Sequence, residues 1–424
     1  MSKVFSQNKE ISNIKPFLAN LNLIICFVGY PLVTSLFLRG SNAYTDVLEA
    51  SRAITIPFRA FSLLLSLIVI LMNFRGSSIK WTHSLKLFAV FCFLLIIRIL
   101  YDLNLRADVM VNNTSQLYLY VFAICLPSMV SVMMSYKYID MEKVLYWIWG
   151  LMVITLVIIM LSNRERLIGE ATDERQSANI AFNSISFGHF GVSTFILSFF
   201  ILVKKQGLRY QKMFRIFLIC ILFLSLFVTL RASSRGPIIA LLVVFSLWIF
   251  SAPKNSLRGL VIVACVLFLI VLNLNSILSY LAVWSPVMEK RIYSTLQEGD
   301  SGRNSLYKNA INTFMDSPFI GKQFAIFNNY GELGYSHNII LDAFMGLGFV
   351  GGAIMIYLLL SAIKKSFALI KDNNRHFWFS LLLIQQIVFN MFSGAFYYNQ
   401  LLWVLFPLIF IYNPHSNKKA LKII

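Results

Sequence analysis

Long apolar runs of about twenty residues alternate with short polar segments along the 424-residue chain. A helix rises about 1.5 Å per residue, so each run matches the roughly 30 Å hydrocarbon core of a bilayer. Spanning strands would alternate apolar and polar residues, which these runs do not. The pattern predicts about twelve transmembrane helices, at 17–38, 54–73, 84–101, 116–135, 143–162, 178–203, 213–230, 236–252, 258–281, 338–361, 376–395 and 397–413.

The ends of this pattern leave one question open. The last two runs are separated by only a few residues around Gly394, so they form either two spans or a re-entrant pair. The polar first sixteen residues precede an apolar run without a cleavage site, which predicts that this run remains as the first span. We therefore expect an all-α integral membrane protein in which residues 1–424 form one polytopic domain.

Composition supports this class, because 58% of the residues are hydrophobic and only 13% are charged. Soluble domains carry roughly a quarter of charged residues. All five cysteines fall inside predicted spans, which indicates buried thiols rather than a disulfide framework. The sequence shows no metal-ligand cluster on the outer face, no nucleotide-binding glycine motif and no nucleic-acid motif. It therefore predicts no metal, no cofactor and no nucleic-acid partner.

The basic residues predict which side of the membrane each loop occupies. With both chain ends on the cytoplasmic side, the inner segments hold 17 Lys and 5 Arg, and the outer segments hold 12 Arg and 3 Lys. Arginine grips phosphate in bidentate fashion and stays charged when partly desolvated. An outward arginine surface therefore suggests a phosphate-bearing lipid or sugar. Pairing with outward acidic residues explains any single arginine equally well.

Residues 282–337 form the longest outward segment, between the ninth and tenth predicted spans. Within 303–316, Leu306, Ala310 and Phe314 make an apolar stripe at helical spacing. We expect an amphipathic helix on the outer membrane face that covers a site. A plain interfacial helix without a functional role is the alternative.

A compact basic turn, Arg231-Ala-Ser-Ser234-Arg235-Gly-Pro, lies between two predicted spans on the outer side. Serine is a good helix N-cap and proline fits a first helical turn, so a helix should begin here with its free amides outward. Arg231 and Arg235 beside those amides would make an anion-binding site. A purely structural turn has little use for two arginines next to hydrocarbon.

His337-Asn338 precedes the tenth predicted span, and Asp342 follows five residues after the histidine. His337 is the only one of the five histidines expected at the outer surface. A neutral imidazole can accept a proton from a sugar hydroxyl or bind it by hydrogen bond. A histidine at a helix start more often has a structural role, so the basic turn on the same face is what favours chemistry here.

Other outward arginines are weaker candidates for substrate binding. Arg59 and Arg98 lie near the outer ends of their spans, where a charge is costly unless it functions or extends to the surface. Arg164, Arg166 and Arg175 are interleaved with acidic residues, so a solvated loop is nearly as good an explanation.

Taken together, these motifs resemble the O-antigen polymerase and ligase superfamily, bacterial membrane glycosyltransferases that use undecaprenyl-pyrophosphate-linked glycans. The resemblance implies a metal-independent glycosyltransferase in the bacterial inner membrane with a periplasmic active face. The matching motifs are Ser234-Arg235-Gly236, Ser301-Gly302-Arg303, Ser317-Pro318-Phe319-Ile320-Gly321, and His337-Asn338 with Gly348 and Gly351 at the family spacing.

Three activities remain open within this reading. The short outward loop, the segment Asn183–Gly188 and the spacing of Arg291 and Gly302 favour an O-antigen polymerase. The His-Asn-glycine signature is best known from ligases, which transfer the glycan to lipid A-core. A lipid-linked-glycan flippase is the third alternative, although two similar halves and midplane polar residues would be typical of a transporter.

The resemblance also implies the roles of individual residues. Arginines would stabilise the developing pyrophosphate charge, and the histidine would bind or deprotonate the acceptor hydroxyl. The bilayer and a chain-length regulator are further candidate partners. For the donor we assign Arg231, Ser234, Arg235, Arg291 and Arg303, and for the acceptor His337, Asn338 and Asp342.

Overall fold

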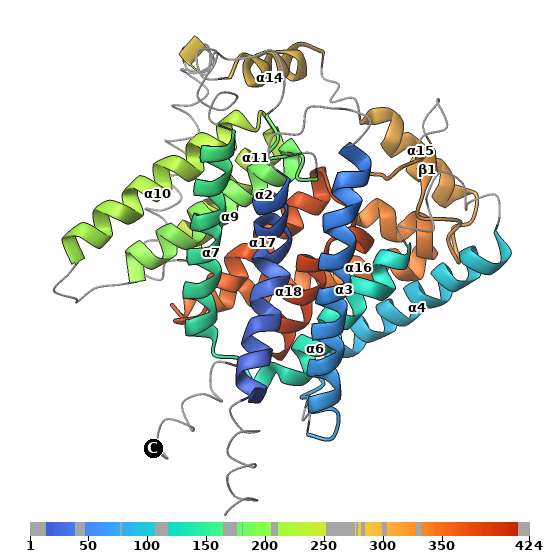
Figure 1. Cartoon of the computed structure of the whole chain (residues 1–424). Helices are drawn as coiled ribbons and strands as arrows, with labels where there is room; N and C mark the ends of the chain where they lie inside the picture. The colour runs from blue at the N-terminus through green and yellow to red at the C-terminus, as the bar shows by residue number, and fades with distance from the viewer. Residues whose placement is uncertain are drawn as a thin grey trace, which may run out of the picture.

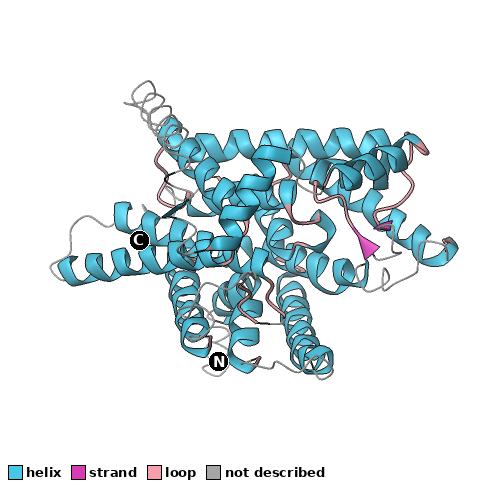
Figure 2. Ribbon diagram, turned by 90° about the horizontal axis from the view of Figure 1, so that it is seen from above, coloured by secondary structure: helices cyan, strands magenta, loops and turns pink. Residues whose placement is uncertain are grey.

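The computed structural model describes an almost entirely helical chain (Figure 2). Within the described part, the strands β1 (Ile326–Phe327) and β2 (Leu333–Gly334) form one short antiparallel pair. The description covers residues 14–38, 47–76, 79–106, 118–163, 176–179, 181–204, 211–251, 276, 279–280, 285–298, 303–327 and 333–413.

Eight described helices are long and apolar enough to cross a bilayer, which confirms a multi-pass membrane protein. The ninth predicted span, 258–281, lies almost wholly outside the described residues, so the predicted total stays a prediction. The eight are Ile14–Phe37 with η1 (Ile25–Gly29) and α2 (Tyr30–Phe37), α3 (Val47–Asn73), α4 (His83–Leu105), Tyr118–Tyr138 with η2 (Val121–Cys125), α6 (Leu126–Ser135) and η3 (Tyr136–Tyr138), α7 (Met141–Ser162), α9 (Ser184–Lys204), α10 (Gln211–Arg231) and α16 (Ile339–Lys371).

The helices α14 (Pro286–Glu298) and α15 (Asn304–Met315) both lie toward the upper end of the bundle in Figure 1, which we call the site end. At the opposite end, Lys204 Nζ donates to Asn373 Oδ1 over 2.5 Å. The Tyr412 hydroxyl donates to Asn374 Oδ1 over 2.7 Å. These contacts join the far ends of α9, α16 and the last helix.

Three further apolar helices are shorter, with 10–17 residues each: α11 (Arg235–Ser251), α17 (Trp378–Phe392) and α18 (Gln400–Ile411). At about 1.5 Å per residue, α17 and α18 reach roughly 22 and 18 Å, against a core of about 30 Å. Most side chains of both helices are buried, and the two pack on each other. They form a hairpin inside the protein, with η4 (Phe396–Tyr398) at its tip.

Helix α16 is longer than the sequence predicted, because it continues ten residues past 361 to Lys371. It also breaks at Gly348, which has φ +66°. The break frees backbone groups that the loop before α16 then satisfies: Lys322 N donates to Met345 O and Phe349 N donates to Pro318 O, both over 2.7 Å. Residues 318–322 are therefore locked to the broken turn.

The predicted amphipathic helix exists as α15, and its apolar stripe is partly covered by protein, with Ala310 fully buried. Leu306, Ala310 and Phe314 pack against Met345 of α16 and Ile326 of β1. The stripe fastens α15 over the first turns of α16. Ile311 and Met315 of the same helix are exposed, so a position of α15 on the outer membrane face stays a prediction.

The lock between the loop and α16 gives a stability prediction. Gly321 has φ +74°, and a Cβ there would lie 2.4 Å from the Gly346 carbonyl carbon. We expect Gly321→Ala to lower the free energy of unfolding by about 1–3 kcal/mol, because both the backbone strain and the overlap oppose folding. Thermal unfolding of the purified protein in detergent measures this.

The matched control is Gly150→Ala in α7, where a Cβ would meet nothing within 4 Å. Alanine has about 1 kcal/mol better helix propensity than glycine, so this change should leave the protein equally or more stable. Equal unfolding temperatures for the two variants would contradict the lock.

Candidate functional site

The basic turn between α10 and α11 is held against α14 by paired contacts. Ser233 has φ +51°, and its hydroxyl lies 2.6 Å from the Ser285 hydroxyl. Arg235 Nη1 donates to the Arg291 carbonyl oxygen, and Arg291 Nη1 donates to the Ser233 carbonyl oxygen, each over 3.2 Å. The structure thus brings two predicted arginines together. Their positive charges share one small region at the site end.

The neighbouring candidates in this turn are largely shielded. Arg231 ends α10 and is buried, as is Ser234. Arg235 opens α11, as the serine and proline signals predicted. The Arg235 guanidinium is partly buried and already donates to the Arg291 carbonyl, so anion binding at this turn stays a prediction.

His337 occupies a strained position at the site end, with φ +56°. Its ring centroid lies 4.3 Å from that of Tyr335. Its Nδ1 is buried and has no hydrogen-bond partner among the described residues. Burial lowers the pKa of the imidazole below the ordinary 6.5, and the charge of Arg303 lowers it further, against a raising contact with the Ser393 backbone. The ring is therefore neutral at neutral pH, which is the form that can accept a proton.

Asn338 and Asp342 support the turn that carries His337. Asn338 Oδ1 accepts hydrogen bonds from the amides of Ile340 and Leu341, at 3.0 and 3.2 Å, and so caps α16. The buried Asp342 carboxylate accepts from the Ser336 hydroxyl over 2.6 Å. Both side chains thus shape the backbone around the histidine. Their assignment to direct substrate binding stays a prediction.

Ser393, at the end of α17, is where these parts meet. Arg303 Nη2 donates to Ser393 Oγ over 3.5 Å, and the Tyr335 hydroxyl donates to the Ser393 carbonyl over 3.4 Å. A Cβ on Gly236 would lie 3.5 Å from Ser393 Oγ and 3.4 Å from His189 Nε2. The loop arginine, the histidine turn and the basic turn therefore surround one serine.

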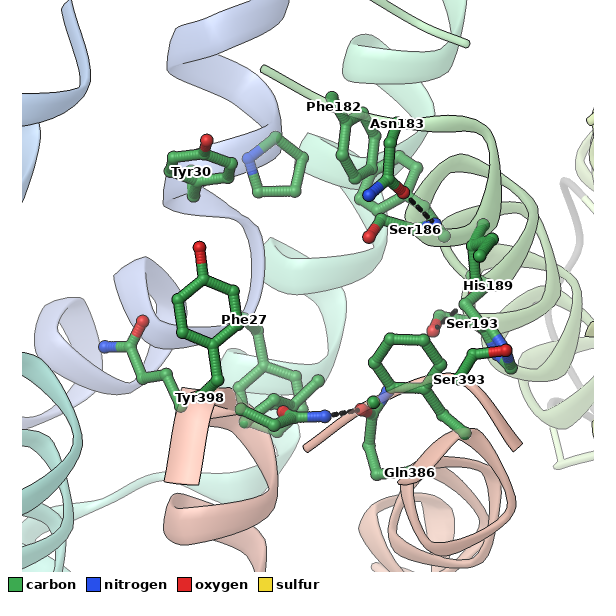
Figure 3. A pocket seen from close by; sticks show the side chains of 18 of the residues that line it. Phe27, Tyr30, Phe182, Asn183, Ser186, His189, Ser193, Gln386, Ser393 and Tyr398 are labelled. Atoms are coloured by element: carbon green, nitrogen blue, oxygen red, sulfur yellow. Dashed lines mark hydrogen bonds between the residues drawn. The ribbon is translucent and has the colours of Figure 1, made fainter. Parts of the chain in front are cut away.

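A cavity of about 310 Å³ opens beside Ser393 (Figure 3). Tyr30 and Tyr398 lie on one side of it, and Asn183 and Ser186 lie on the other. Asn183 Oδ1 accepts from the Ser186 amide over 2.9 Å, so α9 begins at Ser184 rather than at the predicted 178. The cavity is large enough for a small polar ligand.

Amide side chains hold the hairpin tip in place below the cavity. Asn399 Nδ2 donates to Gln386 Oε1 over 3.0 Å, and Gln385 Nε2 donates to the His189 carbonyl over 2.7 Å. Ser193 Oγ donates to Gln385 Oε1 over 2.9 Å. Polar backbone and side chains at membrane depth need such internal partners, because lipid offers none. The cavity wall is therefore rigid.

The remaining predicted arginines separate into distinct roles. Arg59 lines the cavity. Arg98 pairs with Asp102 at 2.9 Å and donates to the Gly321 carbonyl over 3.0 Å, so it anchors the locked loop and does not line the cavity. Arg164, Arg166 and Arg175 lie outside the described residues.

Sequence reasoning missed the hairpin tip as part of the site. Ser393, Tyr398 and Gln386 line the cavity together with Tyr30. The available signal was the polar pair Asn399-Gln400 between two apolar runs, which is unusual at membrane depth. Within the described part of the chain, no group of three or more histidine, cysteine or acidic side chains could hold a metal ion.

Comparison with known proteins covers about a third of the chain. The family model described as O-Antigen ligase matches residues 220–356, which run from α10 through the basic turn to α16. This match confirms the resemblance predicted from the motifs. No curated protein matches the chain.

The geometry around His337 gives a prediction about its titration. In nuclear magnetic resonance spectra of the protein labelled on histidine, the His337 signal should titrate with a midpoint below 6.5. Its pKa is lowered on folding, so the unfolded chain binds more protons as pH falls below 6.5, and the contribution of His337 to stability decreases there. Arg303→Gln should raise the midpoint, because it removes a nearby positive charge.

The control is Arg52→Gln, which removes an exposed arginine of α3. It should leave the His337 midpoint unchanged. A midpoint at or above 6.5 in the wild type, or no response to Arg303→Gln, would overturn this account of the histidine.

Proposed function

We propose that this chain is a membrane glycosyltransferase that elongates a surface polysaccharide as an O-antigen polymerase. The observation that carries this proposal is that Arg303, His337 and the basic turn at Arg235–Gly236 meet around Ser393, and that all three belong to the residues matched by the O-Antigen ligase family model. This arrangement places arginines, which can bind a phosphate group, near a neutral histidine, which can act as a base. Those are the two functions that glycosyl transfer from a lipid pyrophosphate requires.

The donor in this proposal is a glycan on undecaprenyl pyrophosphate at the periplasmic face. The bond between the anomeric carbon and the pyrophosphate oxygen breaks, and the electron pair leaves with the pyrophosphate. Arg235 and Arg303 stabilise the charge that develops on it, with Arg231 and Arg291 adding to the positive potential. Pyrophosphate is already a good leaving group, so stabilising its charge is the main catalytic requirement on the donor side, and these cations meet it.

The acceptor is a sugar hydroxyl of a second lipid-linked glycan. Its oxygen forms the new glycosidic bond to the anomeric carbon, and its proton passes to the imidazole of His337. Asn338 and Asp342 act through the backbone by fixing the turn that presents this ring. Tyr335, packed on the imidazole, restricts its rotation.

Polymerase is favoured over ligase by where the segment Asn183–Gly188 lies. Asn183, Ile185 and Ser186 line the cavity beside Ser393, so the stretch that resembles polymerases faces the proposed site. The outward loop is also short beside what a ligase is expected to carry.

Ligase is the second candidate, because O-Antigen ligase is the description of the matching family model. Deleting the gene separates the two activities through the lipopolysaccharide banding pattern. Loss of a polymerase leaves core carrying a single repeat unit. Loss of a ligase leaves bare core and accumulated lipid-linked polymer. The second pattern would overturn the polymerase proposal.

Single substitutions test the residues themselves. We expect Arg235→Ala and His337→Ala each to reduce glycan elongation by about a hundredfold or more, because each removes one side of the transfer chemistry. The measurement is the surface-glycan ladder in a deletion strain complemented at equal protein level. Arg52→Gln serves as the control and should restore a full ladder. An unchanged chain-length distribution in either alanine variant would remove that residue from the mechanism.

A further inference from the structure

The described cavity wall carries positive charge and no negative charge. Among the described residues that line it, Arg59 is the only arginine or lysine, and none is an aspartate or glutamate. A partly buried guanidinium without a carboxylate partner is costly, unless an anion neutralises it when the site is occupied. The wall therefore has the electrostatic character of an anion site.

Arg59 is held in position and forms no ion pair with a carboxylate among the described residues. Its guanidinium carbon lies 5.3 Å from the centroid of the Tyr120 ring, and it interacts with the Tyr30 hydroxyl. Its buried Nε has no hydrogen-bond partner among the described residues. A guanidinium fixed on one face by an aromatic ring can still bind a carboxylate along its edge in bidentate fashion.

The rest of the wall suits a sugar ring. The Tyr30 hydroxyl is fixed by donating to the Ala181 carbonyl over 3.0 Å, and the Tyr398 and Tyr120 rings lie 5.0 Å apart between centroids. Aromatic surfaces can pack on the apolar face of a sugar ring, and the Asn183 amide can bind its hydroxyls. At about 310 Å³, the cavity is near the lower limit for small-ligand sites.

We propose that this cavity binds an acidic sugar residue of the glycan, with Arg59 holding its carboxylate and the tyrosines packing on its ring. The proposal rests on the glycosyl transfer proposed above and deepens it by naming a substrate class. Because the cavity adjoins Ser393, the sugar bound there lies next to the residues assigned to the reaction. Arg59 is then a specificity-determining residue that selects glycans with uronic acid units.

Binding to the purified full-length protein in lipid nanodiscs tests this without any catalytic turnover. Isothermal titration calorimetry is run with three probes: methyl glucuronide, methyl glucoside and inorganic pyrophosphate. The first two differ only in the carboxylate. We expect the wild type to bind the glucuronide more tightly than the glucoside. Arg59→Gln should weaken glucuronide binding about tenfold or more, because a charge-assisted contact is lost.

The matched control is Arg52→Gln, on the same helix seven residues earlier and exposed. It should leave all three affinities unchanged, as should Arg59→Gln for the glucoside. Equal wild-type affinity for glucuronide and glucoside would overturn the proposal, and this comparison does not require any variant to fold. A larger effect of Arg59→Gln on pyrophosphate than on glucuronide would also overturn it, by placing Arg59 at the donor phosphate.

A further variant separates this inference from the transfer reaction. His337→Ala should keep the preference for glucuronide, since the histidine does not line the cavity. Full glycan elongation in His337→Ala with that preference intact would refute the catalytic assignment alone. If His337→Ala loses elongation as expected, but the protein shows no preference for glucuronide, only the acidic-sugar site is refuted.

Discussion

The contact between the loop at Pro318–Lys322 and the broken turn of α16 is the constraint on which the site depends. A helix that breaks inside a membrane protein leaves backbone groups that lipid cannot satisfy. Here the loop supplies the partners through hydrogen bonds of 2.7 Å at Met345 and Phe349. The same loop carries α15 and is anchored by Arg98. The direction of the first turns of α16, and with it the place of His337, follows from this contact.

A second principle is that polar groups at the site end are shared between helices distant in the sequence. Ser393 contacts Arg303 and Tyr335, and Gln385 connects α17 to α9. Each contact replaces a hydrogen bond that water would make in a soluble protein. Such hydrogen bonds between distant helices help to hold polar groups in place among apolar ones. They also help to fix the spacing between the arginines and the histidine.

Much of this arrangement was accessible from the sequence. Apolar run length located the described helices, and serine and proline signals placed the start of α11 at Arg235. The spacing of apolar residues predicted α15 but not its contacts with α16 and β1, because an apolar stripe can be covered by either protein or lipid. The ion pair between Arg98 and Asp102 has i+4 spacing, so it could also have been predicted from the sequence. The hairpin tip at Ser393 escaped detection because its role exists only through packing between distant segments.

The buried hairpin of α17 and α18 also bears on how the protein is made. The chain enters the membrane in order of synthesis, and these two helices follow all the other described ones. Neither is long enough to be held by lipid alone, so they become stable only when an assembled bundle receives them. Until that moment the wall of the cavity formed by Ser393 and Tyr398 is missing. The cavity is therefore completed only when these two late helices join the bundle.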